Sequence, residues 1–164
     1  MKILLIRHAI AVPHGTPGFT DDERPLTPKG EKRFRKAARG LAAIVRCPQA
    51  LLSSPLPRAL QTAEIAAATW GEVEVTVEPA FAHGNIDEQL DAFTGYPADA
   101  VVAAVGHEPH MSALLARLLG GGKQERLEFR KGGAAMVDLA GAPRDGGRLV
   151  WYIRPRILRA LGKR

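Results

Sequence analysis

The chain opens with Met1-Lys2-Ile3-Leu4-Leu5-Ile6-Arg7-His8-Ala9-Ile10-Ala11, in which an arginine and a histidine directly follow a run of branched apolar residues. A continuous apolar run such as residues 2–6 is typical of a strand that is buried on both faces of a sheet. Arg7 and His8 are polar and can carry charge. The tip of this strand is therefore either a solvated chain end or a place where chemistry occurs.

The composition is that of a globular protein. The chain has 164 residues, 46% hydrophobic and 24% charged, and we expect a single domain over residues 1–164. Its apolar stretches fall short of the ~18 residues needed to cross a bilayer, and Arg7 interrupts the first one too early for a signal peptide. Cys47 is the single cysteine, so an internal disulfide is impossible and a reducing compartment is favoured. We expect a cytoplasmic protein without a membrane partner.

The positive charge is concentrated at the end of the chain. The net charge is +6, and residues 154–164 carry five basic side chains and no acidic one, which leaves +1 for the rest. A basic tail can bind nucleic acid, but the sequence has no helix-turn-helix, zinc-finger or aromatic–basic signature. We therefore expect no nucleic-acid partner and a solvated tail that ends a helix.

Short apolar runs alternate with longer helical patterns, which is typical of an α/β fold. Strands are predicted at residues 2–6, 50–53, 74–77, 100–105, 134–139 and 148–153, and helices at 26–45, 54–70, 86–94 and about 111–118. Thr27 and Ser54 are the expected N-caps of the first two helices, and Gly120-Gly121-Gly122 is expected to form a turn. These elements predict a three-layer α/β/α sandwich with a mostly parallel sheet.

Three of the predicted strands end in residues suited to binding phosphate. The first ends in Arg7-His8, the second in Ser53-Ser54 with Arg58 one helical turn later, and the fourth in Gly106-His107. In open α/β sheets ligands bind beyond the carboxyl ends of the strands. If these three strands are parallel neighbours, two arginines and two histidines meet in one crevice, and a helix beginning near Ser54 adds amide donors for an anion.

Each of these residues also has a simple structural interpretation. Arg7 can be a solvated end of a strand, and His107 can be a hydrogen-bonded residue of the core. Arg58 lies about 200° around its helix from Leu56 and so off the apolar stripe, where an arginine is usually exposed. The order of all three groups along one chain favours a shared site.

The segments "LLIRHAIA" (4–11), "LLSSPLPRALQTAE" (51–64) and "VVAAVGHEPHMS" (101–112) together carry a family resemblance. They resemble the signature of the histidine phosphatase (phosphoglycerate-mutase-like) superfamily: Arg-His-Gly, then Ser-(Ser)-x-x-x-Arg-(Ala)-x-x-Thr, then Gly-His. The short chain and "ERPLTPKG" (23–30) are similar to the SixA-type phosphohistidine phosphatases. The resemblance extends from residue 2 to about residue 155 and implies a phosphoglycerate-mutase-like fold.

The resemblance implies a role for each matching residue. His8 would be the nucleophile, with Arg7, Arg58 and His107 as the rest of the phosphate pocket and Ser54 as a substrate-binding residue. Phosphoryl transfer needs an in-line nucleophile and positive charge around the phosphoryl oxygens, and neutral imidazole is a good nucleophile near neutral pH. Because the arginines supply that charge, we expect no metal and no cofactor.

Two features of the sequence leave the match incomplete. Ala9 stands where the family has glycine, which implies an ordinary backbone angle or slightly less room. The proton donor has no clear match. Asp21 is the first candidate, because SixA-type sequences resemble this one in carrying an acid there, and the other candidates are Asp22, Glu23, Glu78 and His83.

The predicted function is hydrolysis of phosphohistidine in a protein, through a phosphohistidine on the enzyme. The partner would be a phosphorylated protein, such as a histidine domain of a phosphorelay. A site with weak acid catalysis suits the P–N bond, because a leaving imidazole is far less basic than an alkoxide. The alternatives are a phosphomonoesterase acting on a small phosphate ester and a non-catalytic module that binds a phosphorylated ligand. The sequence does not indicate the oligomeric state.

Overall fold

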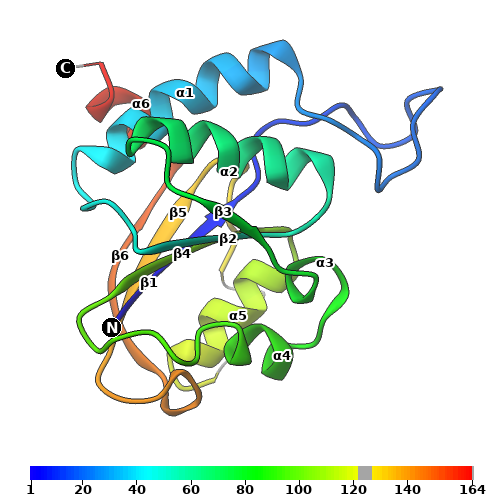
Figure 1. Cartoon of the computed structure of the whole chain (residues 1–164). Helices are drawn as coiled ribbons and strands as arrows, with labels where there is room; N and C mark the ends of the chain where they lie inside the picture. Colours follow the sequence, from blue (N-terminus) through cyan, green and yellow to red (C-terminus); the bar gives the residue numbers. More distant parts are fainter. Residues whose placement is uncertain (122–126, 164) are drawn as a thin grey trace.

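The computed structural model describes residues 1–121 and 127–163, so Gly122 of the glycine run and Arg164 of the basic tail lie outside the described residues. Within these ranges, six strands form one sheet in the order β3-β2-β4-β1-β5-β6 (Figure 1). Their bounds are β1 (Lys2–Arg7), β2 (Ala50–Ser53), β3 (Val75–Val77), β4 (Val101–Gly106), β5 (Ala134–Leu139) and β6 (Gly147–Ile153). Strands β1 to β4 are mutually parallel, whereas β5 is antiparallel to both of its neighbours, so the sheet is mixed and mostly parallel.

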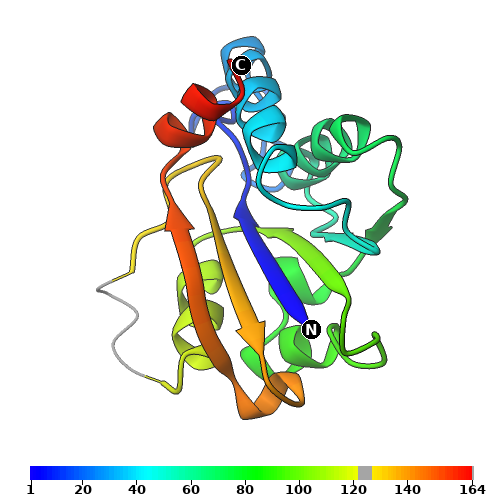
Figure 2. The ribbon, with the colours of Figure 1, turned by 90° about the vertical axis from the view of Figure 1, so that its left-hand side faces the viewer.

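Helices cover both faces of this sheet. Their bounds are α1 (Pro28–Ala42), α2 (Pro57–Thr69), α3 (Ala80–His83), α4 (Ile86–Asp91), α5 (His110–Leu118) and α6 (Pro155–Leu161), with a short 3-10 turn at Pro143–Asp145. Helices α1, α2 and α6 lie on one face, and α3, α4 and α5 lie on the other (Figures 1 and 2). The predicted three-layer α/β/α architecture is therefore confirmed. In the described part of the chain, no helix combines the length and the apolar character that a membrane crossing requires.

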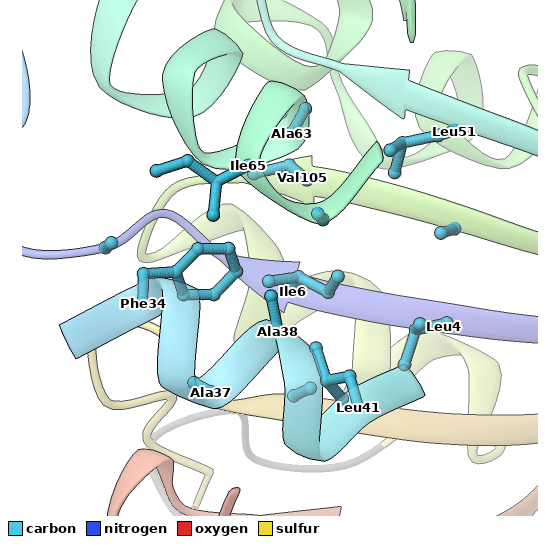
Figure 3. Packing of buried hydrophobic residues seen from close by; sticks show 14 of the residues in the cluster. Leu4, Ile6, Phe34, Ala37, Ala38, Leu41, Leu51, Ala63, Ile65 and Val105 are labelled. Atoms are coloured by element: carbon cyan, nitrogen blue, oxygen red, sulfur yellow. The ribbon is translucent and has the colours of Figure 1, made fainter. Parts of the chain in front are cut away.

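The apolar run of β1 is explained by this double cover. Leu4 and Ile6 belong to the core beneath α1 and α2, whereas Ile3 and Leu5 belong to the second core beneath α5. Successive side chains of a strand point to opposite faces, so a strand with helices on both sides needs apolar residues at every position. Figure 3 shows Phe34 and other apolar side chains of α1 packed against the first of these cores.

Most predicted elements lie within one or two residues of the observed ones at both ends, and the main differences are at helices. Thr27 caps α1 as predicted, because its hydroxyl accepts a hydrogen bond from the Gly30 amide at 3.0 Å. The prediction that Ser54 caps α2 is wrong. Helix α2 begins at Pro57, and its N-cap residue Leu56 makes no side-chain capping bond. The amide donors expected from a helix starting near Ser54 are therefore not placed there. Helix α3 was not predicted.

The basic tail also differs from the expectation of a solvated end. It forms α6, which packs along α1 and buries Leu158 completely. Glycine allows this close approach, since a Cβ on Gly40 would lie 2.0 Å from the Leu158 carbonyl oxygen and one on Gly162 would lie 1.9 Å from that of Lys36. The tail is thus part of the helical layer.

Candidate active site

The tips of β1, β2 and β4 lie side by side at one edge of the sheet. The three strands are parallel neighbours, as the sequence predicted, with Arg7 opposite Gly106 and Ser53 opposite Val105. The residues that follow these strands therefore emerge together. Backbone hydrogen bonds fix them, because the His8 amide donates to the Gly106 carbonyl at 3.0 Å and the Ser54 amide donates to the Val105 carbonyl at 3.0 Å.

Two histidines face each other at this edge. The ring centroids of His8 and His107 are 5.0 Å apart, and the two residues are only 4% and 7% exposed. His107 Nε2 lies 2.8 Å from the hydroxyl of Ser54, so His8, His107 and Ser54 form one cluster. Burial, and repulsion between the protonated ring and nearby cationic groups, lower the pKa of His8 to about 2 and that of His107 to about 3. Both rings are therefore neutral at neutral pH.

The environment of His8 also fixes which ring nitrogen carries the proton. His8 Nδ1 lies 2.7 Å from the carbonyl oxygen of Ala9. A carbonyl can only accept a hydrogen bond, so Nδ1 is the protonated nitrogen. The lone pair is then on Nε2, the nitrogen available to attack an electrophile.

Thr62 holds the backbone that follows His8, and sequence reasoning gave it no role. Its hydroxyl accepts a hydrogen bond from the Ala9 amide at 3.0 Å and donates to the Arg58 carbonyl at 2.6 Å. Thr62 is completely buried. The signal was present, because Thr62 is the last letter of the motif that contains Arg58. Ala9 does not have a positive φ, so the ordinary backbone angle implied by alanine is confirmed.

Arg7 and Arg58 complete the cluster; Arg58 is buried, which is unusual for arginine, and Arg7 is half-buried. Arg58 is 5% exposed, contrary to the surface position that its helical angle suggested. Burial lowers the pKa of both guanidinium groups, yet arginine has so high an ordinary pKa that both remain cationic. The Nε atoms of both are buried and have no hydrogen-bond partner among the described residues. Buried donors without partners fit an oxyanion ligand.

The orientation of Arg7 depends on Glu108. An Nη of Arg7 donates to the carbonyl of Phe129. A carboxylate oxygen of Glu108 accepts hydrogen bonds from the Phe129 amide at 2.9 Å and from the Ser112 hydroxyl at 2.7 Å. Glu108 thus anchors the segment that holds Arg7, a role that its position in "GHEPH" did not reveal.

The first candidate proton donor, Asp21, lies next to Arg58 in the long loop between β1 and α1. Its main-chain carbonyl accepts a hydrogen bond from Arg58 at 2.7 Å, and its carboxylate is 3.6 Å from the same guanidinium. That carboxylate is also 2.7 Å from His14 Nδ1 and 2.8 Å from Arg24. The hydrogen bonds from His14 and Arg24 lower the pKa of Asp21. Asp21 is therefore ionised at neutral pH, which is unfavourable for a proton donor.

The other candidate acids are not brought to the two histidines by any hydrogen bond. Glu23 accepts from Thr20 within its own loop, and Glu78 accepts from the Ala80 amide at 3.1 Å. Asp22 and His83 are exposed. In the ranges that the structure describes, no group of three or more histidine, cysteine or acidic side chains could hold a metal ion.

Arg24 is a further cation at this edge that sequence reasoning missed. Its side chain is 11% exposed and donates to the Val12 carbonyl at 2.6 Å as well as to Asp21. Its charge lies close enough to Arg58 and His107 to lower the pKa of each. Arg24 lies in the segment "ERPLTPKG", where the sequence pointed only to the neighbouring acids as proton donors.

A mostly parallel α/β sheet with one buried and one half-buried arginine and two neutral histidines at its carboxyl edge defines a phosphate-handling enzyme of the phosphoglycerate-mutase-like fold. The chain belongs to the histidine phosphatase superfamily (branch 1), whose sequence model matches residues 3–88, and is thus a phosphatase of that superfamily, a hydrolase. It is 34% identical over 137 residues to an uncharacterized protein of Picosynechococcus sp. (strain ATCC 27264 / PCC 7002 / PR-6), covering 81% of this chain and 82% of the relative.

Solved structures of SixA proteins share this fold. The protein histidine phosphatase SixA complexed with tungstate is 25% identical, with a TM-score of 0.83 over 96% of this chain and 99% of the other. A protein of Nakamurella multipartitia, provisionally described as phosphohistidine phosphatase SixA, is 27% identical, with a TM-score of 0.76 over 94% of this chain and 95% of the other. Both similarities cover nearly the whole chain.

Proposed function

We propose that this phosphatase hydrolyses phosphohistidine in a protein substrate, such as a histidine domain of a phosphorelay. His8 is the proposed nucleophile, Arg7, Arg58 and His107 bind the phosphoryl group, and Ser54 supports His107. The similarity to SixA structures supports the substrate class. The tautomer of His8 supports the nucleophile, because a neutral ring with its lone pair on Nε2 can attack phosphorus without first losing a proton.

In the first step, His8 Nε2 attacks the phosphorus atom of a phosphohistidine whose other ring nitrogen is protonated. The P–N bond breaks, its electron pair goes to the substrate nitrogen, and the substrate histidine leaves as neutral imidazole. The positive charge that develops on the His8 ring is stabilised at Nδ1 by the Ala9 carbonyl, which lies 2.7 Å away. Arg7 and Arg58 are fixed by carbonyl partners and have buried Nε donors free for the phosphoryl oxygens. Charge stabilisation of this kind is the main requirement of phosphoryl transfer.

In the second step, a water molecule attacks the phosphohistidine on His8. The oxygen of water forms a bond to phosphorus, the bond from phosphorus to Nε2 breaks, and inorganic phosphate leaves. His8 then returns to its neutral form. In this proposal, His107, whose Nε2 lies 2.8 Å from the Ser54 hydroxyl, donates a hydrogen bond to the phosphoryl group once the dianion raises its pKa.

An observation at the site also favours a P–N substrate over a phosphate ester. Among the described residues, no carboxyl group is hydrogen-bonded to His8 or His107, and the nearby Asp21 is held ionised by His14 and Arg24. An alkoxide leaving group needs a proton donor, whereas a leaving imidazole does not need one of comparable strength. Transfer between two imidazoles is also nearly isoenergetic, because the bond formed resembles the bond broken.

The test compares the wild type with His8→Ala on a phosphohistidine peptide, a phosphoserine peptide and a panel of small phosphate esters. We expect the wild type to cleave the phosphohistidine peptide fastest and His8→Ala to be inactive. Labelled phosphate should be retained on the wild type, but not on His8→Ala, after a rapid alkaline quench. Faster cleavage of sugar phosphates would instead identify a phosphomonoesterase. Absence of turnover on every substrate would identify a binding module.

A further inference from the structure

The outer surfaces of α1 and α6 carry dense positive charge. Helix α1 contains six lysines and arginines but one acid, Glu31, and residues 154–163 add four basic side chains and no acid. Glu31 forms an ion pair with Arg35 at 3.6 Å and so offsets the charge of one of these cations only. We define the basic face by six of the exposed cations of this surface: Lys29, Lys32, Arg33, Arg35, Arg154 and Arg156.

The fold brings these cations together although they repel one another. The contacts at Gly40 and Gly162 hold α6 tightly against α1. Arg159 belongs to α6 and lines the hollow between the two helices. Burial, together with the charges of Arg33 and Arg156, lowers the pKa of Arg159. Like charges in contact are unfavourable for stability. The close approach of the two helices is made at Leu158 and the two glycines and does not use the charges of the basic face, so their accumulation fits an anionic partner.

The basic face continues into the candidate active site. A narrow hollow between α1 and α6 is lined by Arg33 and Arg159 together with Ala9, Lys131 and Gly132. Ala9 follows the proposed nucleophile directly. Lys131 is close enough to Arg7 and Arg58 for their charges to lower its pKa, together with burial, which is the larger cause. Lys131, Arg33 and Arg159 thus lie between the proposed nucleophile and the outer surfaces of the helices, and α6 lies beside α1 on the same face in Figure 2.

The surface fits a protein better than a nucleic acid. Ile157 is 53% exposed and is adjacent to Arg156, so it offers an apolar anchor among the cations. Single-stranded nucleic acids bind to platforms of exposed aromatic side chains, and in the described residues of α1 and α6 the one aromatic side chain, Phe34, is buried. An acidic helix or strand with one apolar side chain would satisfy both features of this surface.

From these contacts we infer that the basic face docks an acidic surface of the phosphoprotein substrate and so presents its phosphohistidine to His8. The inference rests on the proposed function, since it names the surface by which that substrate is recognised. Complementary charge around the reacting group mainly accelerates encounter and sets partner choice. It should therefore raise kcat/KM for acidic substrates and leave small substrates unaffected.

The experiment uses three probes: free phosphohistidine and two phosphohistidine peptides with the same core, flanked by glutamates in one and by glutamines in the other. The variant Arg33→Gln/Arg156→Gln removes two charges from the basic face. The matched control, Lys2→Gln/Arg148→Gln, removes two exposed charges at the opposite edge of the sheet, where both residues pair in register with Asp138. A third variant, Ile157→Ser, tests the apolar anchor.

We expect the wild type to prefer the glutamate peptide in kcat/KM, and the preference to fall as NaCl rises to about 0.5 M. Arg33→Gln/Arg156→Gln should lose about three- to tenfold on this peptide, as expected for two exposed ion pairs, and nothing on free phosphohistidine. The control variant should behave as the wild type. Ile157→Ser should raise KM for the glutamate peptide.

The inference is overturned if the wild type cleaves both peptides equally, or if the control variant loses as much as Arg33→Gln/Arg156→Gln. Stronger competition by a single-stranded RNA than by the unphosphorylated glutamate peptide would also overturn it and assign the face to nucleic acid. Failure to cleave any of the three probes, free phosphohistidine included, would instead refute the proposed function. The two failures are therefore distinguishable.

Discussion

The hydroxyl of Thr62 accepts a hydrogen bond from the Ala9 amide at 3.0 Å. This contact joins α2, the helix that carries Arg58, to the residue directly after His8. Since the Thr62 hydroxyl also donates to the Arg58 carbonyl at 2.6 Å, one side chain sets the relative position of the proposed nucleophile and a proposed phosphate ligand.

Replacing Thr62 by valine should therefore lower kcat. Valine has nearly the same shape but no hydroxyl, so the buried Ala9 amide loses its partner and the His8 segment can shift. We expect kcat on a phosphohistidine peptide to fall about tenfold, since small displacements of reacting groups are costly. Thr62→Ser should retain most of the activity. A Thr62→Val protein with wild-type kcat, measured under saturating substrate, would contradict this role.

The Glu108 carboxylate should affect Arg7 without touching the substrate. It accepts from the Phe129 amide at 2.9 Å, and the Phe129 carbonyl accepts from Arg7. In Glu108→Ala the segment loses this anchor, so we expect kcat/KM on phosphohistidine to fall by about threefold to tenfold. Glu108→Gln should restore activity, because its amide oxygen can still accept from Phe129.

Ser112→Ala is the control for this prediction. It removes the other hydrogen bond to the same oxygen, at 2.7 Å, and leaves the Phe129 contact intact. Steady-state kinetics and thermal melting should be measured together for all three variants. An equal loss of activity in Ser112→Ala and Glu108→Ala would show that the carboxylate acts only through general stability.

Asp21→Asn should retain most of the activity on phosphohistidine. The hydrogen bonds from His14 and Arg24 lower the pKa of Asp21, so at neutral pH this carboxyl group holds no proton to donate. We expect kcat to stay within about threefold of the wild type, the range that loss of an exposed charge usually produces. A hundredfold loss of kcat that is largest on phosphohistidine would instead assign Asp21 the catalytic role first considered for it.

The sequence predicted best what depends on local pattern. The alternation of short apolar runs and helical stripes located every strand to within one or two residues at each end. The tips of β1, β2 and β4 carried Arg7, His8, Ser54 and His107 in an order that required only parallel neighbours to form one site. These signals are local because a central strand such as β1 or β4, covered by helices on both faces, must be apolar at successive positions.

What the sequence did not predict depends on contacts between distant segments. Ser54 looks like an N-cap, but α2 begins three residues later at Pro57, and the Ser54 hydroxyl instead contacts His107 and the Leu56 amide outside the helix. Arg58 lies off the apolar stripe of α2 and yet is buried, because the loop carrying Asp21 covers it. The docking of α6 depends on two glycines far apart in the chain. No pattern within one segment encodes such contacts.

The two buried histidines should make the stability of the fold fall in mild acid. Burial lowers the pKa of His8 to about 2 and that of His107 to about 3, from an ordinary value of 6.5. At pH values between these lowered pKa values and 6.5, the unfolded chain binds protons at the two histidines that the folded chain does not. The free energy of unfolding therefore rises with pH across this range. The stabilisation is complete above about pH 6.5 and is lost as the pH falls.

The measurement is urea unfolding at several pH values between about 4.5 and 6.5, a window above the ordinary pKa of the carboxyl groups. Each buried histidine should contribute a slope of about 1.4 kcal/mol per pH unit at the acid end of this window. His107→Gln should lower the slope by one such contribution, whereas His83→Asn, which replaces an exposed histidine, should not change it. A slope unchanged in His107→Gln would mean that His107 is protonated in the folded protein, and its ring would then be cationic before any phosphate binds.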